Sequence, residues 1–391
     1  MYRDGVTRRY FFFGSLLAGA VPTGGYGTFK SLRAMGYKPY YDKMNVAAVG
    51  CGGRGENILD EAARTENIVA RGGVDEKRAA DSFRRYARQP KYKDFRGMLD
   101  KEHRNIDAVT IGIPDHMHAT VALACMQMGK HVYLEKPLTR TPWEARLMAD
   151  AAKKYNVATQ MGNQGYSHEA NRVAGEILWS GEIGDVTEVH ASSSPGTHPV
   201  ALTSPLEERA VPENLDWDLW LGGASMRAYS PTYTPYNWRG YFDFGTGQLG
   251  NWGIHVLGPV NLALQLGAPL SVELVQETGG SKWTFPTRAV LRYDFPARGK
   301  MPPVSVFWHD SAMPGEAEAY KVPGMDGQTI LPSADNLHTK GRGAKPRQRS
   351  RGSRRPRTGP PIGAGGPGVE VYNIERRNFD AQPGVLSSNG A

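Results

Sequence analysis

The chain has few of the features that mark disulfide scaffolds, zinc proteins and membrane proteins. Its 391 residues include only two cysteines, Cys51 and Cys125, whose spacing suits neither a metal site nor a disulfide framework. We therefore expect two free thiols. The apolar run at residues 11–17 is too short to cross a bilayer, which takes about twenty apolar residues.

Most of the chain also lacks an excess of positive charge. The formal net charge is +8, but residues 340–357 alone contain nine Lys and Arg and no acidic residue, which leaves −1 for the rest. That balance does not predict a nucleic-acid-binding protein. No aromatic residue lies among these arginines, and hydrophobic periodicity stops near residue 334. We therefore expect residues 335–391 to form a Gly-, Pro- and Arg-rich disordered tail and not an RNA-binding segment.

The N-terminus carries an ordered set of targeting signals. Arg8 and Arg9 precede the apolar run of residues 11–17, and the small residues 18–20 follow it. This order is typical of a twin-arginine signal peptide over residues 1–20, which predicts export to the periplasm and no stable membrane insertion after cleavage. The alternative is a hydrophobic N-terminus on a cytoplasmic enzyme. Residues 21–43 show no periodicity and predict a linker or arm.

Residues 45–55 predict a buried strand that runs into a phosphate-binding turn. Gly50 permits a tight turn, Gly52 leaves room for a pyrophosphate, and Gly55 lets the next helix pack close to its strand. The N-terminus of that helix would face the phosphates. A second apolar run ends at Asp75, twenty residues past Gly55, where a carboxylate would bind the adenosine ribose. The cofactor-binding residues expected in the turn are Gly50, Gly52, Gly53, Arg54 and Gly55.

The pattern of apolar residues divides the chain into two domains. Alternating strands and helices predict an α/β domain with a doubly wound parallel sheet over residues 44–162. Residues 163–334 predict an α+β domain with an open, mostly antiparallel sheet and helices on one face. The expected strands are 106–113, 131–134, 157–161, 186–191, 270–277, 287–295 and 304–309, and the expected helices are 77–88, 141–155, 169–179 and 247–266.

Polar side chains follow two strands of the predicted parallel sheet. Lys136 comes directly after one strand, where burial would lower its pKa and let it exchange a proton with a sugar hydroxyl, and Glu135 would orient it. A surface Lys-Glu pair in a turn is the alternative. Pro114 and His118 follow the preceding strand, so we expect them near the same cleft, with His118 reaching a ribose or substrate hydroxyl. A helix-capping role for Asp115 is an equally good interpretation of that segment.

The second domain offers further candidates. Asn251 and His255 lie four residues apart on a predicted helix and would share one face, which makes His255 the second acid/base candidate. A lone histidine on an apolar helix is, however, more often a core residue. Aromatic residues near Tyr236 would form either a sugar-stacking wall or ordinary loop packing. The expected substrate-binding residues are Asn163, His168, Tyr236, Arg239 and Asn251, and no metal site is expected.

Taken in order, the glycine turn, Asp75, residues 113–118, Glu135-Lys136-Pro137 and residues 250–255 resemble the Gfo/Idh/MocA family of oxidoreductases. The resemblance covers about residues 44–330. It implies a Rossmann domain, an open-sheet substrate domain, and hydride transfer between a nicotinamide cofactor and a sugar or cyclitol alcohol. It also implies that Lys136 is catalytic or contacts the substrate, and it matches the family's Asp-x-x-x-His pair to Asn251 and His255.

The chain departs from that family pattern twice. Asn251 replaces the aspartate, so it cannot hold a negative charge against His255 and raise the pKa of the imidazole. Relatives finish the substrate domain with further strands and a helix, and residues 340–368 offer neither. We therefore expect an incomplete substrate domain.

The expected cofactor is NAD, because Asp75 suits an unmodified ribose, although Lys77 and Arg78 leave NADP open. Export favours a tightly bound cofactor, since free NAD is scarce outside the cytoplasm. The expected partner is a small carbohydrate, with no nucleic acid, and a homo-oligomer is left open. Two alternative functions are a redox-neutral NAD-dependent glycosidase or lyase and a non-catalytic sugar-binding relative.

Overall fold

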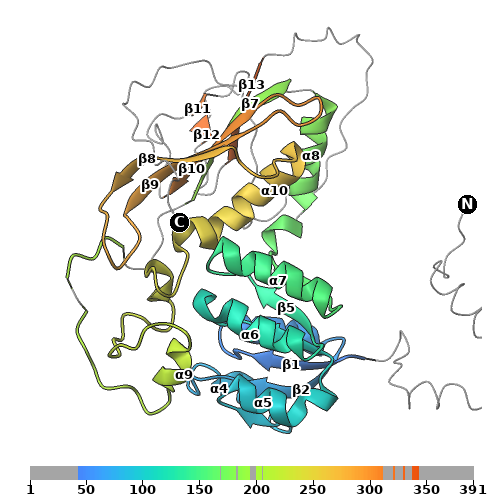
Figure 1. Cartoon of the computed structure of the whole chain (residues 1–391), viewed down its shortest axis with the longest axis vertical. Helices are drawn as coiled ribbons and strands as arrows, with labels where there is room; N and C mark the ends of the chain where they lie inside the picture. Colours follow the sequence, from blue (N-terminus) through green and yellow to red (C-terminus); the bar gives the residue numbers. More distant parts are fainter. Residues whose placement is uncertain are drawn as a thin grey trace, which may run out of the picture. The chain divides into compact units, whose positions relative to one another are not determined.

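The computed structural model describes residues 43–310, apart from 168, 182–183, 194–199 and 205, together with strand segments at 320–321, 329–330 and 337–342. The expected signal peptide, nearly all of the arm that follows it, His168 and most of the expected tail lie outside the described residues. The two larger sheets of the described part have six and five strands (Figure 1). Among these residues, no helix combines the length and apolar character needed to cross a bilayer.

The six-stranded sheet is parallel throughout and has the order β3-β2-β1-β4-β5-β6. The chain order reverses between β1 and β4, and a crevice at such a switch point is where ligands bind in doubly wound sheets. The predicted α/β fold is therefore confirmed. The strands are β1 (Asn45–Val49), β2 (Asn67–Gly72), β3 (Lys91–Tyr92), β4 (Ala108–Ile111), β5 (His131–Glu135) and β6 (Thr159–Gly162).

Local sequence explains where the helices of this domain begin. Thr141 caps α7 in a capping box with Glu144, and Pro142 occupies the first turn, where its missing N–H costs nothing. Helix α6 buries most of its length, including Val121 and Met126, against the sheet. The expected helix at 77–88 is shortened to α4, and α5 was not predicted. The helices are α3 (Arg54–Ala63), α4 (Ala80–Arg85), α5 (Phe95–Glu102), α6 (Asp115–Gln127) and α7 (Pro142–Lys154).

The five-stranded sheet has the order β13-β7-β10-β9-β8, in which only β7 and β10 pair in parallel. Its core includes Val189, Val306 and Trp308 from the strands and Val260 from α10, so the predicted mostly antiparallel sheet with helical cover is confirmed. The strands are β7 (Asp185–Ser192), β8 (Ser271–Thr278), β9 (Arg288–Phe295), β10 (Val304–Asp310) and β13 (Leu337–Arg342). The helices are α8 (Glu169–Ser180), α9 (Trp217–Leu221) and α10 (Ile254–Leu264). Two short strands, β11 (Tyr320–Lys321) and β12 (Thr329–Ile330), form a separate pair.

Strand β13 corrects the prediction for the C-terminal part. Its residues pair antiparallel with β7, from Leu337 opposite Ala191 to Arg342 opposite Asp185. The sequence predicts disorder from residue 335 and no strand after residue 340. Both predictions are wrong for residues 337–342. The physical reason is that without β13 strand β7 would be the edge of the sheet, where its unpaired backbone groups can accept another strand.

An aromatic cluster fixes the long segment that precedes η4, a π-helix at Leu249–Gly253. Trp217, Trp220 and Phe244 are buried in this cluster, with rings packed 4.8 and 4.9 Å apart. The segment also contacts the parallel-sheet domain, because the backbone N–H of Glu76 donates to Asn214 at 2.9 Å. Part of this segment is therefore packed around buried aromatic side chains. It carries η3 (Asn237–Gly240), which contributes to the site described next.

Candidate active site

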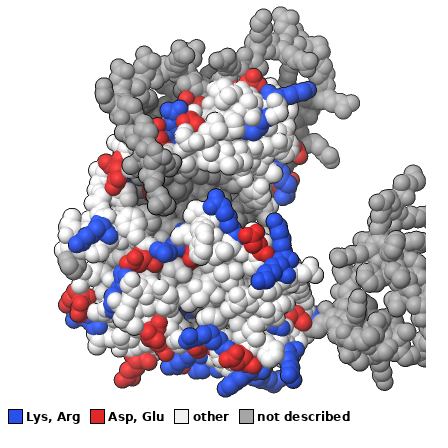
Figure 2. Space-filling model, viewed as in Figure 1, with Lys and Arg blue, Asp and Glu red and all other residues white. Residues whose placement is uncertain are grey.

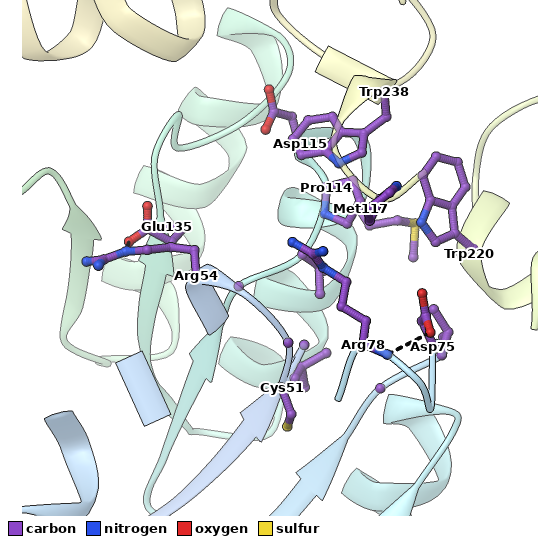
Figure 3. Close-up of a pocket in the computed structure, with 18 of the residues that line it drawn as sticks. Cys51, Arg54, Asp75, Arg78, Pro114, Asp115, Met117, Glu135, Trp220 and Trp238 are labelled. Atoms are coloured by element: carbon purple, nitrogen blue, oxygen red, sulfur yellow. Dashed lines mark hydrogen bonds and ion pairs between the residues drawn. The ribbon is translucent and has the colours of Figure 1, made fainter. Parts of the chain in front are cut away.

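A cleft of about 450 Å³ lies beyond the carboxyl ends of the parallel strands (Figure 3). That volume is in the range of small-molecule sites. The first domain lines the cleft with the glycine turn and with the residues that follow β2, β4 and β5. The second domain lines it with residues 234–239 and with the region around η4 and the start of α10. Residues far apart in sequence therefore meet around one cavity.

The glycine turn leaves no room for side chains. Gly50 has a φ of 83°, and a Cβ there would overlap the backbone of Gly112. A Cβ at Gly55 would overlap the carbonyl of Gly50, so the close packing of α3 on this turn requires glycine at both positions. A Cβ at Gly52 would lie 2.6 Å from Arg78. Gly50, Gly52 and Arg54 line the cleft, whereas Gly53 and Gly55 shape the turn from behind.

Asp75 lies on the cleft wall and is held by two donors. Its Oδ1 accepts the backbone N–H of Arg78 at 3.0 Å and the amide of Asn214 at 2.9 Å. Arg78 also lines the cleft. In Figure 3, Asp75 and Arg78 lie on one side of the pocket, while Arg54 and Glu135 lie together on the other. The carboxylate of Asp75 thus lies near the expected ribose position, while the guanidinium of Arg78 lies beside Gly53 of the glycine turn.

Glu135 is buried and is hydrogen-bonded to Arg54 of the glycine turn. Its Oε1 accepts Arg54 Nε at 2.9 Å and Gln164 Nε2 at 2.8 Å, while Oε2 accepts the backbone N–H of Lys136 at 3.3 Å. Figure 3 shows the contact with Arg54. The expected orientation of the Lys136 ammonium by Glu135 is therefore not the arrangement observed. Glu135 joins the end of β5 to the start of α3, and its charge reaches Lys136 only through space.

The ammonium of Lys136 is held by Asn251. Lys136 Nζ donates to the side-chain Oδ1 and to the backbone carbonyl of Asn251, both at 2.7 Å. Burial, followed by the positive charge of Arg239, lowers the pKa of Lys136 to about 8. An amine with that pKa exists in both protonation states near neutral pH, as a proton-transfer group requires.

His255 lies in the same cleft but is not paired with Asn251. Both residues line the cleft, and the side-chain oxygen of Asn251 accepts its hydrogen bond from Lys136 instead. His255 Nδ1 is buried without a hydrogen-bond partner in the described part of the chain. Burial and the charge of Lys136 lower the pKa of His255 to about 4. The imidazole is therefore neutral at pH 7.

The structure moves two predicted residues out of the cleft. His118 is 1% exposed, and its ring nitrogens lie 2.8 Å from the carbonyl oxygens of Pro137 and Ile113. It therefore supports the loop that carries Lys136 and does not reach a ribose or substrate hydroxyl, because both nitrogens are already engaged. Asn163 is likewise turned away, since its Nδ2 donates to the carbonyl of Ile254 at 3.1 Å.

Other expected residues do line the cleft, namely Pro114, Tyr236, Arg239 and Asn251. Sequence reasoning missed Gln164 and the site role of Asp115. Asp115 is 4% exposed, and its Oδ2 accepts Thr246 Oγ1 at 2.8 Å. Burial raises the pKa of this carboxyl group. Its position at the end of β4, one residue after Pro114, was the available signal. Within the described residues, no three His, Cys, Asp or Glu side chains gather as metal ligands.

Two family models match the two parts of this cleft. An oxidoreductase-family model for an NAD-binding Rossmann fold matches residues 44–163, and one for the C-terminal alpha/beta domain matches residues 200–285. The chain belongs to the Gfo/Idh/MocA oxidoreductase family. Family membership identifies the glycine turn as part of an NAD-binding fold.

Two named relatives match parts of this chain. Levoglucosan dehydrogenase of Pseudarthrobacter phenanthrenivorans is 33% identical over 108 residues, 28% of this chain and 27% of that protein. Inositol 2-dehydrogenase 2 of Saccharopolyspora erythraea is 28% identical over 188 residues, 47% of this chain and 55% of that protein. The chain thus spans between about a quarter and about half of the length of these relatives.

Solved structures share the fold. The WlbA dehydrogenase of Bordetella pertussis, in complex with NADH and UDP-GlcNAcA, has a TM-score of 0.50 at 16% identity and covers 68% of this chain and 71% of its own. GenD2 from gentamicin A biosynthesis, in complex with NAD, has a TM-score of 0.50 at 18% identity and covers 71% of this chain and 68% of its own. At such identities the likeness shows the fold alone.

Proposed function

We propose that this protein is an NAD(P)-dependent oxidoreductase that acts on a secondary alcohol of a sugar or cyclitol. The observation that carries the proposal is the position of Lys136. Its ammonium projects from the end of β5 into a cleft that also contains the glycine turn, and Asn251 holds it at 2.7 Å. The names of the levoglucosan and inositol dehydrogenases support the substrate class.

The residues present fit a dinucleotide. The turn has no side chain at Gly50 or Gly52, so a pyrophosphate can approach the backbone. Helix α3 begins at Arg54 and has no side-chain cap, so its N-terminus can face phosphate oxygens. The carboxylate of Asp75 suits ribose hydroxyls. When bound, the nicotinamide supplies the hydride acceptor or donor.

Lys136 and His255 supply the proton chemistry. Because the pKa of Lys136 is about 8, its neutral amine can accept the hydroxyl proton in the oxidation direction, and its ammonium can return a proton in the reverse direction. His255 is neutral at pH 7 and offers a second acceptor on the same cleft. Asn251 holds Lys136 by a hydrogen bond, and its side chain carries no negative charge that could raise the pKa of His255. We therefore assign the main catalytic role to Lys136 and a secondary role to His255.

The proposed cofactor is NAD in preference to NADP. Asp75 is fixed by Asn214 and by the backbone of Arg78, so its carboxylate would repel a ribose phosphate. Arg78 is the residue that would favour NADP. We also propose export by the twin-arginine route and tight retention of the dinucleotide, on the basis of Arg8, Arg9 and the apolar run that follows them.

The test measures reduction of NAD and NADP with a panel of sugars and cyclitols. We expect turnover by the wild type and its loss in Lys136→Ala, with dinucleotide binding retained. Lys153→Ala is the matched control, because Lys153 is exposed in the last turn of α7. Unchanged turnover in Lys136→Ala would remove this lysine from the mechanism. Failure of the wild type to bind either dinucleotide would overturn the proposed function.

A further inference from the structure

Arg239 is the second-domain cation on the cleft wall. We propose that the substrate carries an anionic group, a carboxylate or a phosphate, and that Arg239 binds it. This inference rests on the proposed function and narrows its substrate class. It concerns a residue that the sequence already predicts to bind the substrate.

The guanidinium of Arg239 is fixed from two sides. Its Cζ lies 4.1 Å from the ring centre of Tyr236 and 4.2 Å from that of Trp238. Trp238 is buried, and the aromatic cluster behind it is packed tightly. A cation stacked in this way is already ordered before a ligand arrives, so it loses little freedom on binding.

Most of the donors of Arg239 remain available. A guanidinium has five N–H groups, and the hydrogen bond seen in the described part of the chain is from Nη1 to the carbonyl of Tyr236, at 3.1 Å. Arg227 and Arg292 of the same domain instead pair with carboxylates, at 2.5 and 3.0 Å. No ion pair joins Arg239 to a carboxylate among the described residues. A planar fork of free donors matches the geometry of a carboxylate or phosphate.

The charges around Arg239 favour an anion at the substrate end. Its positive charge lowers the pKa of Lys136, which places two cations in the same part of the cleft. Asn251 is neutral where the family pair has an aspartate, so one repulsive charge is removed. Asp115 accepts a hydrogen bond from Thr246, and burial raises the pKa of its carboxyl group. The two cations in the cleft differ from the described outer surface in view in Figure 2, where acidic and basic side chains are interspersed.

The dinucleotide phosphates have their own partners. The N-terminus of α3, the glycine turn and Arg78 lie at the end of the cleft formed by β1 and β2. Arg239 comes from η3, beside Tyr236, and its positive charge lowers the pKa of Lys136, the proposed proton-transfer group. We therefore assign Arg239 to the substrate and not to the pyrophosphate.

The experiment compares matched neutral and charged sugars on the NAD-loaded full chain. The pairs are D-glucose with D-glucuronate, D-sorbitol with D-gluconate, and D-glucose with a glucose phosphate. Binding is followed by tryptophan fluorescence, since Trp238 and Trp252 line the cleft, and turnover is measured in parallel. We expect a charged member to bind about ten- to a hundredfold more tightly than its neutral partner, as a charge-assisted hydrogen bond provides. The uronate and phosphate arms separate the two sources of the anion.

Three variants make the test specific. Arg239→Met should abolish the preference for charged sugars, and Arg239→Lys should retain part of it. Lys282→Met removes a stacked cation elsewhere in this domain, 4.5 Å from the Trp283 ring, and should change nothing. The inference is overturned if neutral sugars bind as tightly as every charged partner, or if Arg239→Met weakens NAD binding and leaves the charge preference intact. Lys136-dependent turnover of neutral sugars without any charge preference would overturn this inference while the proposed function stands.

Discussion

Replacing Asn251 by Asp tests how the cleft sets the protonation state of Lys136. The change exchanges an amide oxygen 2.7 Å from Nζ for a carboxylate oxygen and alters little else in size. An opposite charge at this range raises a lysine pKa by about 1–3 units. The pKa of Lys136 should therefore rise from about 8 to between about 9 and 11. At pH 8 the neutral fraction would fall from about one half to between about one tenth and one thousandth.

The assay is the pH dependence of kcat/KM in the direction of alcohol oxidation. If the neutral amine accepts the proton, the rising limb in Asn251→Asp should move to higher pH, with the plateau reached later. At pH 8 the loss should be between about fivefold and several hundredfold. Asn251→Ser is the control, because it shortens the side chain without adding charge and should not raise the pKa. A rising limb that stays near pH 8 in Asn251→Asp would refute the assignment of this limb to Lys136.

Three further predictions concern stability and the glycine turn. Lys136→Met should raise the free energy of unfolding by about 3 kcal/mol at pH 7. Since the folded pKa of about 8 lies below the ordinary 10.5, that gain should fade between pH 8 and 10.5, as thermal melts at each pH would show. Because His255 binds its proton at a lower pH in the folded protein than in the unfolded chain, the free energy of unfolding should fall between pH 6.5 and 4. His255→Gln should reduce that fall. An unchanged fall in the variant would contradict this prediction. Gly55→Ala should abolish dinucleotide binding, measured by calorimetry, because the added Cβ overlaps the Gly50 carbonyl. Gly97→Ala in α5 is the control. Its Cβ meets open space, so this change should leave the stability of the protein unchanged or raise it slightly.

Local sequence determined the first domain almost completely. The alternation of apolar strands and amphipathic helices, together with the turn at Gly50 and Gly55, specifies a doubly wound sheet because each signal depends on neighbours a few residues away. The same logic placed Asp75 and Lys136 at strand ends, and the structure puts both on the cleft wall. The shorter elements β3 and α5 were missed because brief segments carry little periodicity.

Tertiary structure decided which side chains face the cleft. His118 and Asn163 follow strand ends as Lys136 does, yet carbonyl groups from other segments engage them, and no local pattern reveals such partners. Asn251 is hydrogen-bonded by Lys136, 115 residues away in sequence, and not by His255, four residues further along the chain. Strand β13 likewise joined a sheet edge that composition could not foresee. Sequence alone thus determined the fold and the strand ends, whereas contacts between distant segments decided the pairing, burial and charge of the groups that meet there.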